Sequence, residues 1–158
     1  MATKPYFPKR EGPAPISARL VRRVRLEEVD PLGIMWHGRY PSYLEDGREH
    51  LGRVYGFGYI AFREAGVALP IRTLHFDYLS PLSYAEEVTV ETILHWHEGA
   101  RLNMEYVLYD AEGRLACRAY SVQMMLDFSR RILLESPPFF RAIQERWRNG
   151  ALEPCTAQ

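Results

Sequence analysis

One long helical segment set among strand-like segments most constrains the fold of this chain. From Tyr40 onward, apolar or small residues recur at i, i+3, i+4, i+7 and i+11, which places them on one stripe of a helix. Pro41 suits the first turn of this helix, and Gly56 with Gly58 can end it. Gly47 lies within the apolar stripe, where a glycine costs about 1 kcal/mol relative to alanine. We interpret this glycine as a point of close contact between the helix and a sheet.

Five further segments alternate apolar and polar residues with a period of two, which is the pattern of half-buried strands. These segments are residues 18–29, 69–79, 87–97, 102–109 and 115–128. Short joints at residues 98–100 and 111–113 are typical of hairpins, so the later strands should pair antiparallel with their neighbours. A last helix is expected over residues 138–148, with its aromatic residues on one side.

A single helix that buries one stripe on a curved sheet is the plan of the hot-dog fold. The sequence therefore predicts an α+β hot-dog fold, with a long central helix wrapped by a five-stranded antiparallel sheet. One helix leaves the other sheet face and the edges without cover, so we expect a homodimer or homotetramer. Prolines in polar surroundings predict a flexible N-terminal arm over residues 1–17, followed by one domain over residues 18–149 and a C-terminal tail over residues 150–158.

The charge balance and the cysteine count exclude several classes of protein. The 158 residues include 20 Lys or Arg and 20 Asp or Glu. Three basic residues and one acidic residue lie within the first 17, so the rest of the chain carries 17 basic and 19 acidic residues. Such a body lacks the cationic surface that a phosphate backbone requires, and we expect no nucleic-acid partner. Two cysteines, no secretion signal and no run of 18 apolar residues predict a cytoplasmic protein that does not enter a membrane.

The positions of the lysines exclude several kinds of catalysis. Both lysines, Lys4 and Lys9, lie in the expected arm, which removes Schiff-base chemistry and the P-loop lysine, because arginine does not deprotonate. His95 and His97 would share one side of a strand as metal ligands sometimes do, but no convincing third ligand accompanies them. We expect neither a metal nor an organic cofactor.

The loop before the long helix and the first turns of that helix read VDPLGIMWHGRYPSYLEDGRE, from Val29 to Glu49. This stretch resembles the 4-hydroxybenzoyl-CoA thioesterase family of hot-dog proteins, in which an Asp, a Gly, a short apolar run, an aromatic residue or His and a Tyr lead into the helix. The matching residues are Asp30, Pro31, Gly33, Ile34, Met35, Trp36, His37 and Tyr40, followed by Glu45 and Arg48 on the helix. The resemblance covers about residues 18–135.

The resemblance implies hydrolysis of an acyl-CoA thioester, with Asp30 as nucleophile or general base. A carboxylate can attack the thioester carbonyl directly or deprotonate a water molecule, and the sequence leaves both routes open. Either route builds negative charge on the carbonyl oxygen, which the free N–H groups at the helix N-terminus can receive. By the same resemblance, the His37 backbone N–H is the expected donor, with Gly38 beside it, and the Tyr40 hydroxyl can point into the pocket.

Glu45 is the rival catalytic carboxylate, because a second group of hot-dog thioesterases places its carboxylate on the central helix. It could equally form an ordinary surface ion pair with Arg48. The expected substrate contacts are Gly33, Trp36, Tyr43 and Phe76 at the acyl group and Arg101 and Arg118 at the CoA phosphates. Because few cations follow Trp96, a thioester of acyl-carrier protein stays open as the substrate.

The acyl group is expected to be aryl, short-chain or branched, because aromatic residues surround the loop and helix. Two other functions stay open. The chain could be a hot-dog module that binds an acyl-CoA or a partner without catalysis, in which Asp30 would be dispensable. It could also be a hydratase or dehydratase of an acyl thioester, for which only His37 is well placed as the catalytic histidine.

Overall fold

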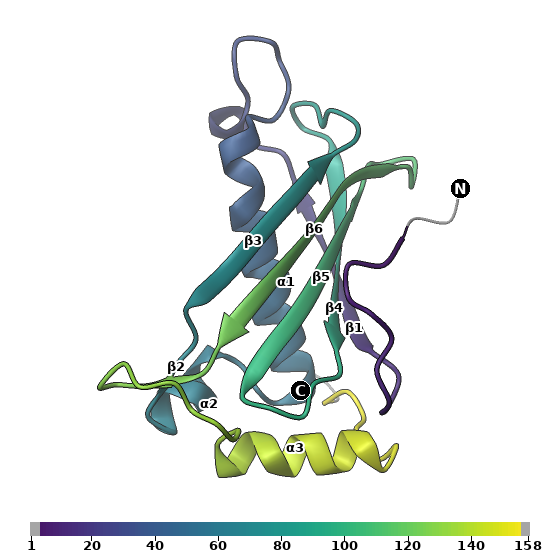
Figure 1. Ribbon diagram of the computed structural model, residues 1–158. Helices are drawn as coiled ribbons and strands as arrows, with labels where there is room; N and C mark the ends of the chain where they lie inside the picture. Colours follow the sequence, from purple (N-terminus) through teal and green to yellow (C-terminus); the bar gives the residue numbers. More distant parts are fainter. Residues whose placement is uncertain (1–3, 156–158) are drawn as a thin grey trace.

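A five-stranded antiparallel sheet wraps around one long helix in the computed structural model, which describes residues 4–155 (Figure 1). The strands lie in the order β1, β4, β5, β6, β3 across the sheet. Their bounds are Ile16–Arg23 for β1, Ile71–Tyr78 for β3, Glu87–His95 for β4, Arg101–Tyr109 for β5 and Leu115–Met124 for β6. A second, two-stranded sheet pairs β2 (Val67–Ala68) with β7 (Leu126–Asp127). The α+β hot-dog fold that the sequence predicts is confirmed.

The helices include the two that the sequence predicts and a third that it does not. Helix α1 spans Tyr40–Tyr55 and ends at Gly56, which takes a left-handed φ of 80°. Helix α2 (Tyr59–Glu64) occupies what the sequence pattern leaves as a connector, and α3 (Pro138–Arg148) closes one end of the sheet. Within residues 4–155, no helix combines the length and the apolar character needed to cross a membrane.

Four of the five predicted strands extend past the observed ones, and in two of them the excess is four residues or more, for local reasons. The first ends at Arg23 rather than continuing to residue 29, because residues 26–28 form a 3₁₀ turn in which the Glu28 carboxylate accepts the Arg25 backbone N–H at 2.9 Å. The last strand is interrupted after Met124, and the short β7 begins at Leu126 in the other sheet. Both errors arise where the alternating pattern continues through a turn.

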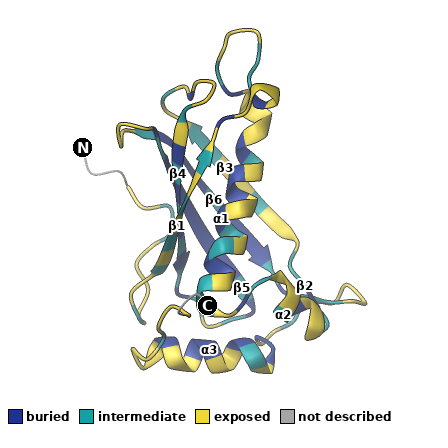
Figure 2. Ribbon diagram, turned by 180° about the vertical axis from the view of Figure 1, so that it is seen from behind, coloured by how far each residue is buried: buried dark blue, intermediate teal, exposed yellow. Residues whose placement is uncertain are grey.

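Helix α1 lies against the inner face of the sheet and packs on β1 and β4. Alternate residues of β4 point at it and are buried, as the dark blue stretches behind the helix show (Figure 2). A Cβ atom at Gly47 would lie 2.3 Å from Thr92 Oγ1 and 3.1 Å from Val90 Cγ1. Any larger side chain would therefore push the helix off the sheet, which confirms the close contact inferred from the sequence.

The outer face of the sheet carries polar residues and is partly covered by the segment before β1. The Arg118 guanidinium donates to the Lys4 carbonyl at 3.2 Å and to the Glu105 carboxylate at 2.7 Å, and it lies 4.4 Å from the centre of the Tyr6 ring. At the other end of this segment, the Trp147 indole donates to the Ala14 carbonyl at 2.8 Å. Strand β1 begins at residue 16, two residues before the expected start of the domain, and residues 1–3 and 156–158 of the expected arm and tail lie outside the described part.

We expect Gly47→Ala to lower the free energy of unfolding by about 1–3 kcal/mol, because overpacking at the contact with Thr92 outweighs the better helix propensity of alanine. Urea unfolding of the two proteins measures this difference. In a Thr92→Ala background, which removes the nearest atom, most of the loss should disappear. A Gly47→Ala protein as stable as the wild type would show that the helix does not approach the sheet this closely.

Candidate functional site

The loop between β1 and α1 holds Asp30 in a tight turn. The Gly33 N–H donates to the Asp30 carbonyl at 2.9 Å, and the Asp30 N–H donates to the Ile34 carbonyl at 2.9 Å. Gly33 has φ 77°, a left-handed conformation that favours glycine, so it shapes the turn. Asp30 Oδ1 accepts the Leu32 N–H at 2.8 Å, whereas Oδ2 accepts no hydrogen bond from residues 4–155. One carboxylate oxygen is thus fixed by the backbone and the other is available.

The N-terminal end of α1 presents free backbone N–H groups beside this turn. A 3₁₀ turn over residues 37–39 precedes the helix, and its first hydrogen bond runs from the Arg39 N–H to the Trp36 carbonyl at 2.9 Å. The His37 and Gly38 N–H groups come before that bond and meet no acceptor in the described part of the chain. The Tyr78 hydroxyl donates to the His37 carbonyl at 3.1 Å, which holds the turn in place.

Asp30, His37 and Tyr40 line one pocket of about 370 Å³. Its other walls are Ile34, Met35, Tyr78, Leu79, Ser80 and Pro81. The Tyr40 ring meets the Tyr78 ring edge-on with 4.9 Å between centres, and burial raises the pKa of Tyr40 to about 12. Tyr40 therefore stays a neutral hydroxyl near pH 7. The structure thus brings the Asp30 carboxylate, His37 and Tyr40 together around one pocket.

A buried carboxylate, Glu28, braces the loop from below. Glu28 is 4% exposed, and its carboxylate accepts the Arg22 guanidinium at 2.9 Å and the Tyr43 hydroxyl at 2.8 Å. Its backbone carbonyl accepts the Trp36 N–H at 2.8 Å, at the far end of the Asp30 loop. The same residue therefore ties together β1, α1 and both ends of the loop.

Sequence reasoning missed Glu28, and it offered Tyr43 both as a core residue and as a contact of the acyl group. The available signal was an acidic pair, Glu27 and Glu28, inside a stretch that was interpreted as an alternating strand. Tyr43 is fully buried, and burial together with its hydrogen bond to Glu28 raises its pKa. The structure brings Tyr43 to neither cavity, because its hydroxyl is committed to Glu28, so its place is in the core rather than at the substrate.

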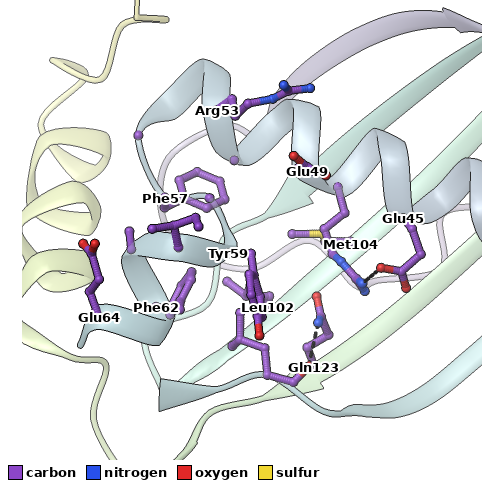
Figure 3. Close-up of a pocket in the computed structure, with 17 residues that line it drawn as sticks. Glu45, Glu49, Arg53, Phe57, Tyr59, Phe62, Glu64, Leu102, Met104 and Gln123 are labelled. Atoms are coloured by element: carbon purple, nitrogen blue, oxygen red, sulfur yellow. Dashed lines mark hydrogen bonds and ion pairs between the residues drawn. The ribbon is translucent and has the colours of Figure 1, made fainter. Parts of the chain in front are cut away.

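A cavity of about 710 Å³ lies further along α1, between this helix, α2 and the sheet (Figure 3). Its walls are largely apolar and include Phe57, Phe62, Leu69, Leu102 and Met104. Glu45 also lines this cavity and pairs with Arg48 of the next helical turn. The ordinary ion pair considered for Glu45 is therefore present, and it borders the apolar cavity rather than the Asp30 pocket.

The aromatic residues expected at the substrate take different places. Trp36 is 46% exposed and lies over Gly38, where a Cβ atom would be 2.2 Å from the indole ring. It lines neither the Asp30 pocket nor the apolar cavity. Phe76 lies on β3 and stacks on Tyr78, with 5.6 Å between ring centres, so it supports the wall of the Asp30 pocket from behind.

The two arginines expected at the CoA phosphates are not beside Asp30. Arg118 lies on the outer face of the sheet and is held by the Glu105 carboxylate, whose pKa is kept low by hydrogen bonds from His95 and Arg118 that outweigh its burial. Arg101 donates to Asn103 at 2.9 Å on the same strand. Their distance from the loop follows from strand alternation, which turns both side chains away from α1.

The histidines considered as metal ligands are already engaged. His95 pairs with Glu105 at 2.9 Å, and the Nδ1 atom of His97 accepts the Gly99 N–H at 2.9 Å. Between residues 4 and 155, no three His, Cys, Asp or Glu side chains come together in a geometry that could hold a metal ion.

Comparison with known proteins assigns the family. A model of the thioesterase-like superfamily matches residues 24–146. The chain belongs to this superfamily. It is similar to the Bacillus subtilis (strain 168) protein named "Putative acyl-CoA thioesterase YneP", with 32% identity over 104 residues that cover 66% of this chain and 75% of the relative. The narrower resemblance to 4-hydroxybenzoyl-CoA thioesterases stays a prediction.

Solved structures show the same fold at lower identity. A DHNA-CoA thioesterase from Staphylococcus aureus superposes with a TM-score of 0.75 at 20% identity, covering 85% of this chain and 95% of that one. A second Staphylococcus aureus protein, solved in complex with CoA, gives a TM-score of 0.73 at 18% identity and covers 96% and 93% of the two chains. These likenesses agree with the hot-dog architecture of this superfamily member.

We expect Glu28→Ala to lower the free energy of unfolding by about 1–3 kcal/mol, because it leaves the buried Tyr43 hydroxyl without its acceptor and removes one of the two carboxylates that pair with Arg22, which keeps Asp46. Glu27→Ala is the matched control, since Glu27 is adjacent, exposed and only loosely paired with Arg25, and it should change stability by less than about 0.5 kcal/mol. Urea unfolding measures both values. Equal losses in the two variants would contradict a bracing role for Glu28.

Proposed function

We propose that this chain is an acyl-CoA thioesterase, which hydrolyses a thioester to a carboxylic acid and free CoA. Membership of the thioesterase-like superfamily and the printed names of similar proteins support this reaction. The observation that carries it is that Asp30 and His37 line one pocket, at the end of α1 where the His37 N–H and the neighbouring Gly38 N–H meet no acceptor within residues 4–155. A carboxylate and oxyanion donors are the two groups that cofactor-free acyl transfer needs.

Asp30 acts at the thioester carbonyl carbon in either of two ways. Its free oxygen attacks the carbon to form a mixed anhydride that water later opens, or it removes a proton from a water molecule that attacks in its place. In both routes the C–S bond breaks as the tetrahedral intermediate collapses, and the CoA thiolate leaves and takes up a proton. The His37 and Gly38 N–H groups hold the charge on the oxygen, and losing one such donor costs about 100- to 1,000-fold in rate.

A second copy of the chain completes this site in our proposal. The Asp30 pocket and the apolar cavity lie along different parts of α1. Strand β3 is an edge of the sheet and exposes Leu74 and Tyr78. If two copies pair through β3 about a two-fold axis perpendicular to the sheet, the opposite ends of their α1 helices lie side by side. Asp30 of one copy then faces the apolar cavity of the other.

The apolar cavity accepts the acyl group, and its aromatic and aliphatic walls suit an aryl, short-chain or branched group. We propose CoA as the carrier, because a similar protein is named an acyl-CoA thioesterase and another was solved in complex with CoA. Glu45 is the second candidate for the catalytic carboxylate, and the observation in its favour is that it lines the larger cavity. Its carboxylate is paired with Arg48, whereas one oxygen of Asp30 accepts no hydrogen bond within residues 4–155.

We expect Asp30→Asn to reduce kcat/KM by about 1,000-fold or more, since the amide is neither a base nor a nucleophile. Glu45→Gln is the matched control on α1 and should stay within a few-fold of wild type. Free-thiol release from a panel of acyl-CoA esters measures both. The opposite order of effects would transfer the catalytic role to Glu45, and a wild-type protein that binds but cleaves none of the panel would identify a non-catalytic binding module.

Leu74→Glu should convert the proposed dimer to a monomer and abolish most of the activity, because it places a charge on the inner, largely apolar face of the proposed contact strand. Thr73→Glu places the same charge on the other face of β3 and should leave the dimer intact. Sedimentation velocity gives the mass of each variant, and thiol release gives its activity. A wild-type monomer with full activity would rule out the shared site.

A further inference from the structure

We propose that Gln123 makes the apolar cavity specific for acyl groups whose far end carries a hydrogen-bond donor, such as a hydroxyl group on a ring or chain. This inference rests on the proposed thioesterase function and names the substrate feature that the same site selects. The inference follows from one buried, unpaired polar atom, Gln123 Oε1, in the largely apolar wall of the cavity.

Gln123 belongs to β6 and faces the cavity from the inner side of the sheet, opposite Leu102 on β5. It is only 2% exposed. Its Nε2 atom donates to the Leu69 carbonyl at 2.9 Å. Its Oε1 atom is buried and accepts no hydrogen bond from the described residues. In Figure 3 this oxygen points away from the Leu69 contact, toward Met104 and the interior of the cavity.

The amide cannot turn its donor toward the cavity instead. A half-turn of the side-chain amide would place Oε1 against the Leu69 carbonyl oxygen, which sets two acceptors in contact and removes the one hydrogen bond that the Gln123 side chain makes within residues 4–155. The Leu69 carbonyl therefore fixes the orientation of Gln123. The cavity presents an acceptor at this point, and the matching ligand group is a donor.

No side chain within residues 4–155 donates to this acceptor. Leu102 and Met104 on the adjacent strand and Phe62 on α2 are apolar. Tyr59 and Arg48 also line the cavity, but Arg48 pairs with the Glu45 carboxylate and neither side chain donates to Gln123. A polar group set in a largely apolar wall fixes the orientation of a ligand that can pair with it.

An acyl group with a hydroxyl at its far end would give Oε1 a partner, whereas an isosteric group without a donor would bury the same atom unpaired. A buried unpaired acceptor is costly, and sites built to pair with a substrate hydroxyl reject the analogue that lacks it. We expect a preference of about 10- to 100-fold in kcat/KM for the donor-bearing ester.

The test uses two matched pairs of acyl-CoA esters. One pair is 4-hydroxyphenylacetyl-CoA and 4-fluorophenylacetyl-CoA, and the other is 8-hydroxyoctanoyl-CoA and octanoyl-CoA. Free-thiol release gives kcat/KM for each ester with the wild-type protein. If no ester of the two pairs is cleaved, the proposed thioesterase function fails for these acyl groups, and calorimetric binding of the same pairs then measures the preference without turnover.

Two variants identify the residue responsible. Gln123→Leu should remove the preference, because kcat/KM for the donor-bearing ester falls toward that of its donor-free partner. Leu102→Met changes the facing position of the same wall without altering its polarity, and it should keep the preference. A wild-type protein that cleaves or binds both members of each pair equally overturns the inference, and this comparison holds even if Gln123→Leu fails to fold. A preference that survives in folded Gln123→Leu overturns it as well.

Discussion

The contact between the apolar stripe of α1 and the inner face of the sheet is the constraint on which the rest of the structure depends. Gly47 removes the side chain that would separate helix and sheet, and Thr92 and Val90 fill the space directly beneath it. Because the helix is held at its middle, both of its ends are placed with respect to the sheet. The N-terminal end meets the Asp30 loop, and the C-terminal half forms the roof of the apolar cavity.

The N-terminal end of α1 must also be held in place beside the Asp30 loop. The structure does this with polar groups buried beneath the loop rather than with apolar packing. Glu28 offers two carboxylate oxygens and a backbone carbonyl, and these receive donors from β1, from α1 and from the end of the loop. A buried ion pair adds little net stability, but it fixes the positions of its partners closely, because the loss of one partner leaves a buried charge less well compensated. That strictness suits a loop whose backbone N–H groups must meet one oxygen atom.

The sequence is informative wherever one periodicity persists, and it fails where local hydrogen bonds compete with it. The stripe from Tyr40 predicts the helix nearly to the residue, and the alternation over residues 87–97 predicts a central strand that ends two residues earlier, because burial of one face decides both. Periodicity does not predict the 3₁₀ turn before Val29, because this turn depends on the Glu28 side chain, which accepts the Arg25 N–H. It does not predict helix α2 either, because six residues are too few for a periodic stripe to be distinguished.

In the candidate site, too, the sequence predicts some features and misses others. Local chain order places Asp30, His37 and Tyr40 around one pocket, since all three lie within one loop and one helical turn. From the sequence alone, Tyr43 is an equally good candidate for the site, yet its hydroxyl points into the core and donates to Glu28. The apolar cavity could not be predicted at all, because its walls come from α1, α2, β5 and β6 and meet only after the sheet has formed.

The Asp30 pocket and the apolar cavity are separate, and they depend on different groups: backbone N–H groups at the pocket and side chains at the cavity. In the proposed mechanism, the charge on the reacting oxygen at the Asp30 pocket is met by N–H groups, whose positions depend on the hydrogen bonds of the loop. At the apolar cavity the wall is made of side chains, and the Gln123 amide is held in place by the Leu69 carbonyl between β2 and β3. We therefore expect a substitution in the β6 part of the cavity wall to alter what fits without moving those N–H groups, because within residues 4–155 no hydrogen bond of the loop involves β6. Under this proposal, substrate choice and bond breaking depend on different elements of one fold, joined through helix α1.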